Sequence, residues 1–76
     1  MKDVEITREP IELHKLLQFG GLASSGGEAK ALIADGHVLL NGVVETQKRK
    51  KLVSGDCIEM GETKLKLRLI ETPSQS

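Results

Sequence analysis

The sequence predicts an α+β fold, with two packed helices followed by a short, mainly antiparallel sheet. In the first half of the chain, apolar residues recur at three- and four-residue spacing, which is typical of helices that bury one face. After Gly36 the spacing changes to an alternation of apolar and polar residues, which is typical of strands. The chain has 76 residues, enough for one compact domain, and we expect that domain to span 1–71.

A strand and a helix are expected at the start of the chain. Val4 and Ile6 alternate with polar residues, which predicts a strand over 3–7 with both apolar side chains facing inward. A helix is predicted from about Pro10 to Phe19, because proline is favoured at the first helical position and the two glycines after Phe19 can end a helix. We expect Phe19 to belong to the core. The apolar stripe of this helix consists of Leu13, Leu16 and Leu17.

The second helix has well-marked ends. Ser25 and Glu28 have the spacing of a capping box, in which each side chain accepts a hydrogen bond from the backbone N–H of the other residue. Gly36 supplies a residue that can end the helix. Each helix is expected to present one narrow apolar face to a shared core, because the spacing of the apolar residues is the same in both. In the second helix these residues are Ala29, Leu32 and Ile33.

A hairpin is expected directly after the second helix. Asn41-Gly42 is a strong hairpin signal, and we expect it to join a strand near Val38 and Leu40 to a return strand that begins at Val43. The return strand should reach about residue 45 or 46. Its end leads into the most strongly charged part of the chain.

Two further strands are expected at 57–60 and 64–70, joined by a turn at Gly61-Glu62. In the last strand, leucines alternate with basic residues, which predicts one buried face and one exposed, positive face. The basic residues are Lys64, Lys66 and Arg68, and a solvated sheet surface is their favoured interpretation. Residues 72–76 contain no apolar side chain, which predicts a disordered tail.

Four cations are adjacent at Lys48-Arg49-Lys50-Lys51, and no acidic residue occurs from Thr46 to Gly55. The formal net charge of the whole chain is zero, so a strong global attraction for polyanions is not expected. Adjacent cations repel one another unless an anion offsets them, and they suit phosphate groups. On composition alone, a solvated loop is an equally good interpretation. Leu52 and Val53 are expected to anchor the far end of the loop in the core.

The start of the second helix is the other candidate anion site. The backbone N–H groups around Ser25, Gly26 and Gly27 would lie at the positive end of the helix dipole, and the glycines permit close approach of a phosphate. An ordinary capped helix is the alternative interpretation. Lys30 lies in the first turns of this helix, where a ligand anion or solvent could offset its charge.

Other features argue against several classes of protein. The longest apolar run, Val38-Leu39-Leu40, is too short to span a membrane, and the polar start predicts no signal peptide. The single cysteine, Cys57, cannot form an internal disulfide, which suits a reducing compartment and predicts a cytoplasmic protein. His14 and His37 lack metal-ligand spacing, and no nucleophile–base set is recognisable. We therefore expect no metal, no cofactor and no enzymatic activity.

The order of these motifs resembles the S4-type RNA-binding domain, also called the alpha-L motif. The ordered set is specific, although each fragment alone is common. The matching residues are Ser25-Gly26-Gly27-Glu28-Ala29-Lys30, Leu32-Ile33, Gly36-His37-Val38, Asn41-Gly42, Glu45-Thr46 and Lys50-Lys51-Leu52 through Gly55-Asp56. The resemblance extends over roughly 11–69, and the whole length is similar to small stand-alone bacterial S4-like proteins. It implies binding of structured RNA, with ribosomal and transfer RNA as candidates. We expect the protein to be a monomer.

In the family, the two helices and the adjoining hairpin and loop form an L-shaped positive groove. We expect the start of the second helix and the basic run to border one concave strip that holds an RNA backbone. Many members have an arginine where this chain has Gly26, so one phosphate contact is expected to be missing. For Asn41, a structural role in the turn is favoured over RNA contact. The candidate RNA-binding residues are Ser25, Gly26, Gly27, Lys30, Asn41, Lys48, Arg49, Lys50 and Lys51.

Two further expectations concern the mode of binding and its alternative. Phe19 is the only aromatic residue, and proteins that hold unpaired bases generally stack them on several aromatic side chains. The protein is therefore expected to recognise the shape of the RNA backbone. The alternative function is a protein-interaction module that docks an acidic partner, such as a ribosome-associated factor.

Overall fold

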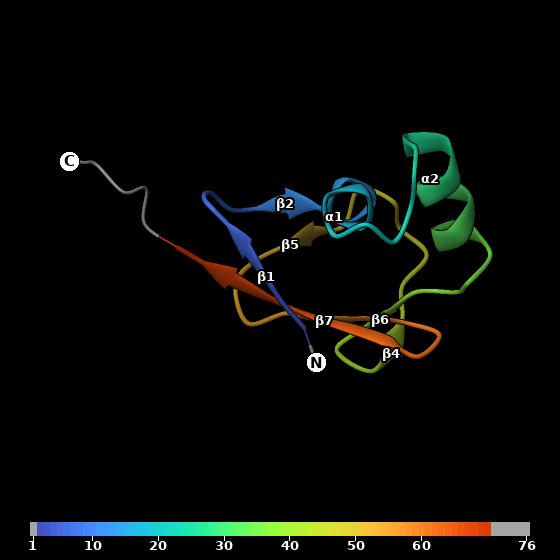
Figure 1. The fold of residues 1–76 in the computed structure, drawn as a ribbon. Coiled ribbons are helices and arrows are strands. Elements are labelled where there is room, and N and C mark those ends of the chain that lie inside the picture. Colours follow the sequence, from blue (N-terminus) through green and yellow to red (C-terminus); the bar gives the residue numbers. More distant parts are fainter. Residues whose placement is uncertain (1, 71–76) are drawn as a thin grey trace.

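The computed structural model describes residues 2–70 and confirms the predicted α+β class. Its two helices, α1 (Leu13–Phe19) and α2 (Gly26–Ala34), pack against each other, and the strands lie to one side of them (Figure 1). No helix in this part of the chain is long and apolar enough to cross a membrane. The disordered tail predicted for 72–76 lies outside the described residues.

The strands form a five-stranded sheet and a separate two-stranded one. The order in the larger sheet is β1 (Lys2–Ile6), β7 (Thr63–Leu69), β6 (Cys57–Met60), β3 (Leu39–Leu40) and β4 (Val43–Val44). Its neighbours are antiparallel except β1 and β7, which run parallel. In the smaller sheet, β2 (Ile11–Glu12) pairs antiparallel with β5 (Lys51–Leu52). The sequence did not predict the second sheet or the pairing of the first strand with the last.

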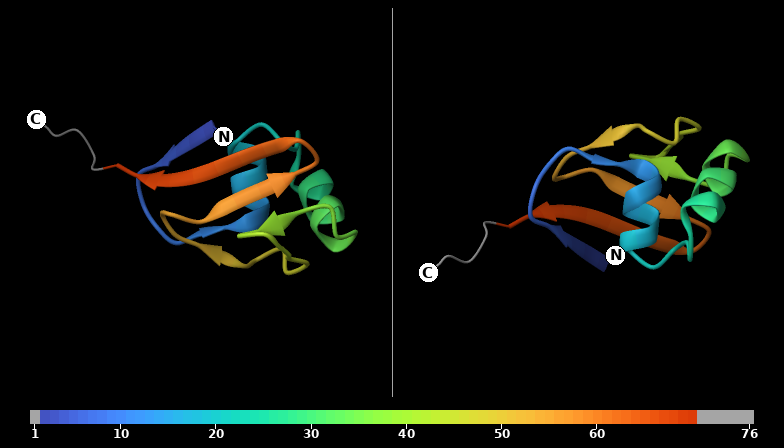
Figure 2. Two further views of the ribbon diagram at one scale, coloured as in Figure 1. Left: turned by 90° about the horizontal axis from the view of Figure 1, so that it is seen from below. Right: turned by 90° about the horizontal axis from the view of Figure 1, so that it is seen from above.

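The core lies between α1 and the face of the large sheet that α1 crosses (Figure 2). All three leucines of the predicted α1 stripe have no exposed surface, and Ala29 and Ile33 of α2 are buried equally completely. The predicted inward positions of β1 are also confirmed, since Val4 and Ile6 are buried. In β7 the alternation is confirmed at Leu65 and Leu67 but ends at Leu69, which is 42% exposed.

The first helix begins later than the sequence predicted. It starts at Leu13, whereas Pro10 lies before β2 and the residues Ile11 and Glu12 pair with β5. The helical spacing of the leucines correctly located α1. It could not show that the preceding two residues are extended, because their pairing partners lie about 40 residues further along the chain.

Two apolar residues expected in the core are exposed. Phe19 is 65% exposed, because it follows Lys15 by one helical turn and therefore lies on the outward side of α1. Val53 is 45% exposed, so that only Leu52 anchors the end of the basic run. The return strand of the hairpin is also shorter than expected and ends at Val44.

The predicted ends of α2 and the predicted hairpin turn are confirmed. Ser25 Oγ accepts a hydrogen bond from the Glu28 N–H at 3.1 Å. The second half of the capping box is shifted by one residue, since Glu28 Oε1 accepts hydrogen bonds from the N–H and the hydroxyl of Ser24. Gly36 follows α2 with a φ of 79°, and the hairpin turn has positive φ at both Asn41 and Gly42.

Candidate nucleic-acid interface

The basic loop, residues 47–51, is attached to the start of α1 through its backbone. The Lys50 N–H donates to the Gln47 carbonyl at 3.1 Å, which closes a turn within the loop. The Lys48 and Lys50 carbonyls accept hydrogen bonds from the His14 and Leu13 N–H groups at 3.0 and 2.9 Å. These carbonyls point towards α1, while the side chains of the loop are exposed.

This attachment satisfies a requirement of α1. The first N–H groups of any helix have no acceptor within the helix, and a side chain commonly supplies one. The residue at this position, Glu12, makes no such capping bond, and the loop carbonyls accept instead. The position of the loop is therefore coupled to the folding of α1.

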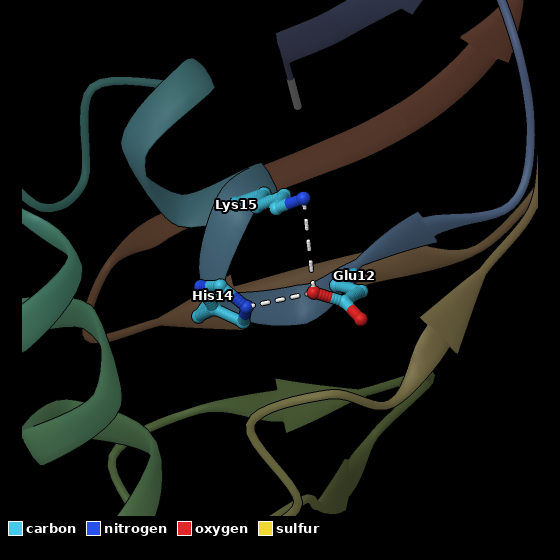
Figure 3. Close-up of polar contacts among 3 residues, drawn as sticks. All are labelled: Glu12, His14 and Lys15. Carbon is cyan, nitrogen blue, oxygen red and sulfur yellow. Dashed lines mark hydrogen bonds and ion pairs between the residues drawn. The ribbon is translucent and has the colours of Figure 1, made fainter.

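A polar cluster lies at the start of α1, next to the basic loop (Figure 3). His14 Nε2 lies 2.9 Å from Glu12 Oε1, and Lys15 Nζ lies 3.9 Å from the same oxygen. The hydrogen bond with His14 lowers the pKa of Glu12, and the positive charges of Lys15 and Arg49 lower this pKa further. His14 is buried with its Nδ1 unpartnered among the described residues. The sequence did not indicate that His14 would contact Glu12, because residues two apart show no helical or metal-ligand pattern.

The cations of the basic loop form no ion pair within residues 2–70. All four side chains, from Lys48 to Lys51, are exposed. Across residues 2–70, the ion pairs involve only Glu12 with His14 and Lys15, so that none includes the loop. The loop can therefore accept anionic groups from outside the protein without first breaking an internal ion pair.

The start of α2 has backbone donors available. Ser25 Oγ accepts the Glu28 N–H, and the hydrogen bonds found within 2–70 include none from the N–H groups of Gly26 or Gly27. A Cβ at Gly26 would lie 3.6 Å from Gln18 Oε1, which is an ordinary contact distance, so the glycine is not required by packing. Lys30 is half-buried.

The two predicted anion-binding features flank α1. Gly26 lies near Gln18, towards the end of α1, whereas the basic loop binds the start of α1. The helix has seven residues and is therefore about 10 Å long at 1.5 Å per residue. In all three views, the yellow-green to olive segment that contains the loop runs beside α2 at one end of the molecule (Figures 1 and 2).

Asn41 has a structural role at the hairpin. Its Nδ2 donates to Asp56 Oδ1 at 3.2 Å, and its Oδ1 accepts the Cys57 N–H at 2.9 Å. Asp56 Oδ2 also accepts the Val53 N–H at 2.9 Å. These bonds connect the hairpin to the turn before β6, in keeping with the structural interpretation favoured from the sequence.

Sequence reasoning missed a cleft next to the basic loop. It has a volume of about 390 Å³ and lies between α1 and the connection from β1 to β2. Isolated cations such as Arg8 and Lys15 give no signal of a patch in the sequence, and residue type alone places Phe19 in the core. The four-residue spacing of Lys15 and Phe19 could have shown that they share the outward side of α1. The residues of most interest in the lining are Arg8, Pro10, Ile11, Lys15, Phe19 and Lys51.

The described residues contain no group of three or more His, Cys, Asp and Glu side chains arranged to hold a metal ion. Exposed cations, free backbone donors and a partly apolar cleft lie around one short helix.

Comparison with known proteins gives matches of both sequence and structure. Residues 4–68 match the model of the S4 domain family. YbcJ of Escherichia coli strain K12, which is named as a candidate RNA-binding protein, is 46% identical over 48 residues, or 63% of this chain and 69% of that protein. YbcJ of Shigella flexneri has the same identity and coverage.

The fold is also similar to a solved structure. The solution structure of YbcJ from E. coli, described as revealing an αL motif involved in RNA binding, matches with a TM-score of 0.68 and 35% identity. The match covers 88% of this chain and 86% of YbcJ. The chain therefore belongs to the S4 domain family and has its alpha-L fold.

Proposed function

We propose that this protein binds structured RNA through its phosphate backbone, using the basic loop and the start of α2. RNA binding in general is supported by membership of the S4 domain family and by the similarity to YbcJ. The observation that carries the choice of surface is the basic loop itself. Its four cations are exposed and unpaired within 2–70, and its backbone is fixed to α1.

The basic loop supplies the charge for this interaction. Lysine binds phosphate as a point charge, and Arg49 can donate to two phosphate oxygens at once. Because the net charge of the chain is zero, the attraction is confined to this surface and indiscriminate binding to polyanions is limited. The fixed backbone of the loop reduces the conformational entropy that RNA binding would cost.

The start of α2 supplies a second contact. Gly26 and Gly27 offer backbone N–H groups at the positive end of the helix dipole, where a phosphate is favoured. Both features lie against α1, which is about 10 Å long. One strand can therefore contact both features. Lys30 is a further candidate contact, while Asn41 acts chiefly through the shape of the hairpin.

The biological setting is proposed from the residues and from the family resemblance together. We expect the protein to act as a monomer in the cytoplasm, without cofactor or catalytic activity, on ribosomal or transfer RNA. Crosslinking in cells and sequencing of the attached RNA would identify the target. Nuclease treatment before a pull-down separates this proposal from docking of an acidic protein, because a protein partner bound directly would survive the treatment.

Salt dependence tests the proposed surface on the RNA identified in this way. Neutralising about four phosphates predicts a slope of about −3 to −4 for log K against log salt, at roughly 0.7–0.9 per contact. Replacing all four cations from Lys48 to Lys51 by alanine should remove most of this slope and leave the thermal unfolding temperature nearly unchanged. A variant with Lys64, Lys66 and Arg68 replaced by alanine is the matched control. An unchanged slope in the loop variant would refute the assignment of the loop.

A further inference from the structure

We propose that the cleft beside α1 binds one unpaired nucleotide of the RNA, with the base against Phe19 and its phosphate among Arg8, Lys15 and Lys51. We call it the Phe19 cleft. This inference rests on the proposed function and extends it, because it adds a site for a base to a surface that otherwise contacts only the backbone. The sequence suggests that bases are not stacked, because Phe19 is the only aromatic residue and is expected in the core.

The apolar part of the cleft suits a nucleobase. Phe19 is 65% exposed and lines the cleft, together with Pro10 and Ile11. The cleft volume of about 390 Å³ is within the range of sites that bind small organic molecules, roughly 300–1,000 Å³. Stacking on an aromatic ring does not depend strongly on the identity of the base, since every base has a π face. One exposed ring therefore suffices for one nucleotide.

The charged part of the cleft suits the phosphate of the same nucleotide. Arg8, Lys15 and Lys51 bring three cations to the lining, against one acid, Glu12. Glu12 Oε1 is already engaged by His14 and Lys15. Neither Arg8 nor Lys51 forms an ion pair within the part of the chain that the structure describes.

A neighbouring acid is also held by the protein backbone. Glu9 Oε2 accepts the Ser54 N–H at 2.7 Å. This bond connects the segment before β2, which forms one wall of the cleft, to the turn that follows β5. The wall that carries Arg8 and Pro10 is therefore attached to the turn that directly follows β5, the strand in which the basic run ends.

The position of Lys51 favours RNA as the occupant over an unrelated small molecule. Lys51 is the last residue of the basic loop and also lines the Phe19 cleft, and its register partner in β2 is Glu12. An RNA strand that follows the loop cations therefore reaches the cleft without crossing an uncharged surface. A base that is already unpaired can enter without the loss of a base pair.

Two RNA hairpins of equal stem length provide the first test. One has a fully paired stem, and the other has a single bulged adenosine in its stem. Wild-type protein should bind the bulged hairpin more tightly. Phe19→Leu keeps an apolar side chain at an exposed position but removes the ring. It should weaken binding of the bulged hairpin about 5- to 150-fold, the range measured for loss of base stacking, and leave binding of the paired hairpin unchanged.

The loop variant with alanine at all four cations separates this inference from the proposed function. If it weakens binding of both hairpins while Phe19→Leu affects neither, the cleft is not a nucleotide site and the proposed function stands. If the loop variant binds both hairpins as the wild type does, the proposed function fails, and the inference fails with it. Arg8→Gln combined with Lys15→Gln should weaken binding of the bulged hairpin more than that of the paired one.

Proton NMR provides a direct test that needs no particular RNA sequence. The chain has one phenylalanine and neither tyrosine nor tryptophan, so its aromatic proton signals come from Phe19 and two histidines. Titration with adenosine 5′-monophosphate should move the Phe19 ring signals upfield and saturate, whereas ribose 5-phosphate should not. An absence of any shift of the ring signals with the nucleotide would overturn the inference.

Discussion

The protein has two concentrations of positive charge, and they differ in what lies opposite them. The basic loop carries four adjacent cations, of which Lys51 is in register with Glu12 of β2, while the other three lie outside the strand pairings. The exposed side of β7 carries three cations, each in register with an acidic residue of a neighbouring strand. The pairs are Lys64 with Glu59, Lys66 with Asp3, and Arg68 with Glu5.

We infer from this difference that strand pairing affects which cations can attract a polyanion. Side chains in register on adjacent strands lie close enough for opposite charges to offset each other. Two of the acids come from β1, whose parallel pairing with β7 joins the two ends of the described chain. From their basic residues alone, the two regions would be expected to attract a polyanion almost equally. Among residues 2–70, the topology gives each of the three β7 cations an acidic register partner, but only one of the four loop cations, Lys51.

Charge reversal should give the largest difference between the two regions. Lys48→Glu with Lys50→Glu places two negative charges where phosphates are proposed to bind. At a surface, where one close charge pair is worth about 1–4 kcal/mol, this change should weaken RNA binding on the order of 100-fold. Lys64→Glu with Lys66→Glu should weaken it only a few-fold. Fluorescence anisotropy with one RNA measures both, and equal losses would contradict the comparison.

Removing the acids opposite β7 should make the exposed face of β7 bind RNA more like the basic loop does. Asp3→Asn, Glu5→Gln and Glu59→Gln together leave the β7 cations uncompensated. At low salt we expect added, weakly specific RNA binding, with the slope of log K against log salt steeper by about 2–3. Glu62→Gln is the control, because Glu62 lies in the turn between β6 and β7. If the triple variant and the control variant bind RNA equally well, the acids do not suppress RNA binding at this face.

The sequence predicted the features that depend on neighbours along the chain. The leucine stripe of α1, the Ser25 cap, the glycine after α2 and the Asn41-Gly42 turn were all located correctly. Each depends on side chains within about four residues, which is the range over which helix and turn patterns act. The fold class and the family followed from their order.

The sequence could not predict features that depend on distant partners. The start of α1 was placed too early, because Ile11 and Glu12 are extended only through pairing with β5. Phe19 was assigned to the core by residue type, although its helical position is outward. The Phe19 cleft is formed by segments around Arg8, Lys15 and Lys51, and no single stretch of sequence contains all three.

Gly26→Arg should strengthen the second contact of the proposed surface by a smaller amount. A Cβ at this position would lie 3.6 Å from Gln18 Oε1, which leaves room for a side chain, and many family members have arginine here. One added exposed ionic contact of about 1 kcal/mol should raise RNA affinity roughly fivefold. Gly26→Gln controls for the loss of glycine flexibility. Equal affinities of the two variants would show that this position does not approach a phosphate.

Glu28→Gln should have the smallest effect on RNA binding and a clear effect on stability. Hydrogen bonds from the Ser24 N–H and hydroxyl lower the pKa of Glu28 below its ordinary value of 4.5. A carboxyl group with a lowered pKa in the folded state stabilises the protein above its unfolded pKa, and this contribution is lost as pH falls through the folded pKa. The variant should therefore unfold at a lower temperature than the wild type at pH 7.

The pH dependence distinguishes this ionic cap from simple loss of packing. The difference in unfolding temperature between Glu28→Gln and wild type should shrink as pH falls from neutral to below 4.5, because protonation removes the charge from the wild-type side chain. A difference that is constant with pH would contradict the role of the carboxylate.

Since the same variant removes a negative charge beside the proposed phosphate site, RNA affinity at pH 7 should rise slightly. The start of α2 would then stabilise the fold through Glu28 and bind RNA through its free N–H groups, whereas the basic loop caps α1 with its carbonyls and binds RNA with its side chains.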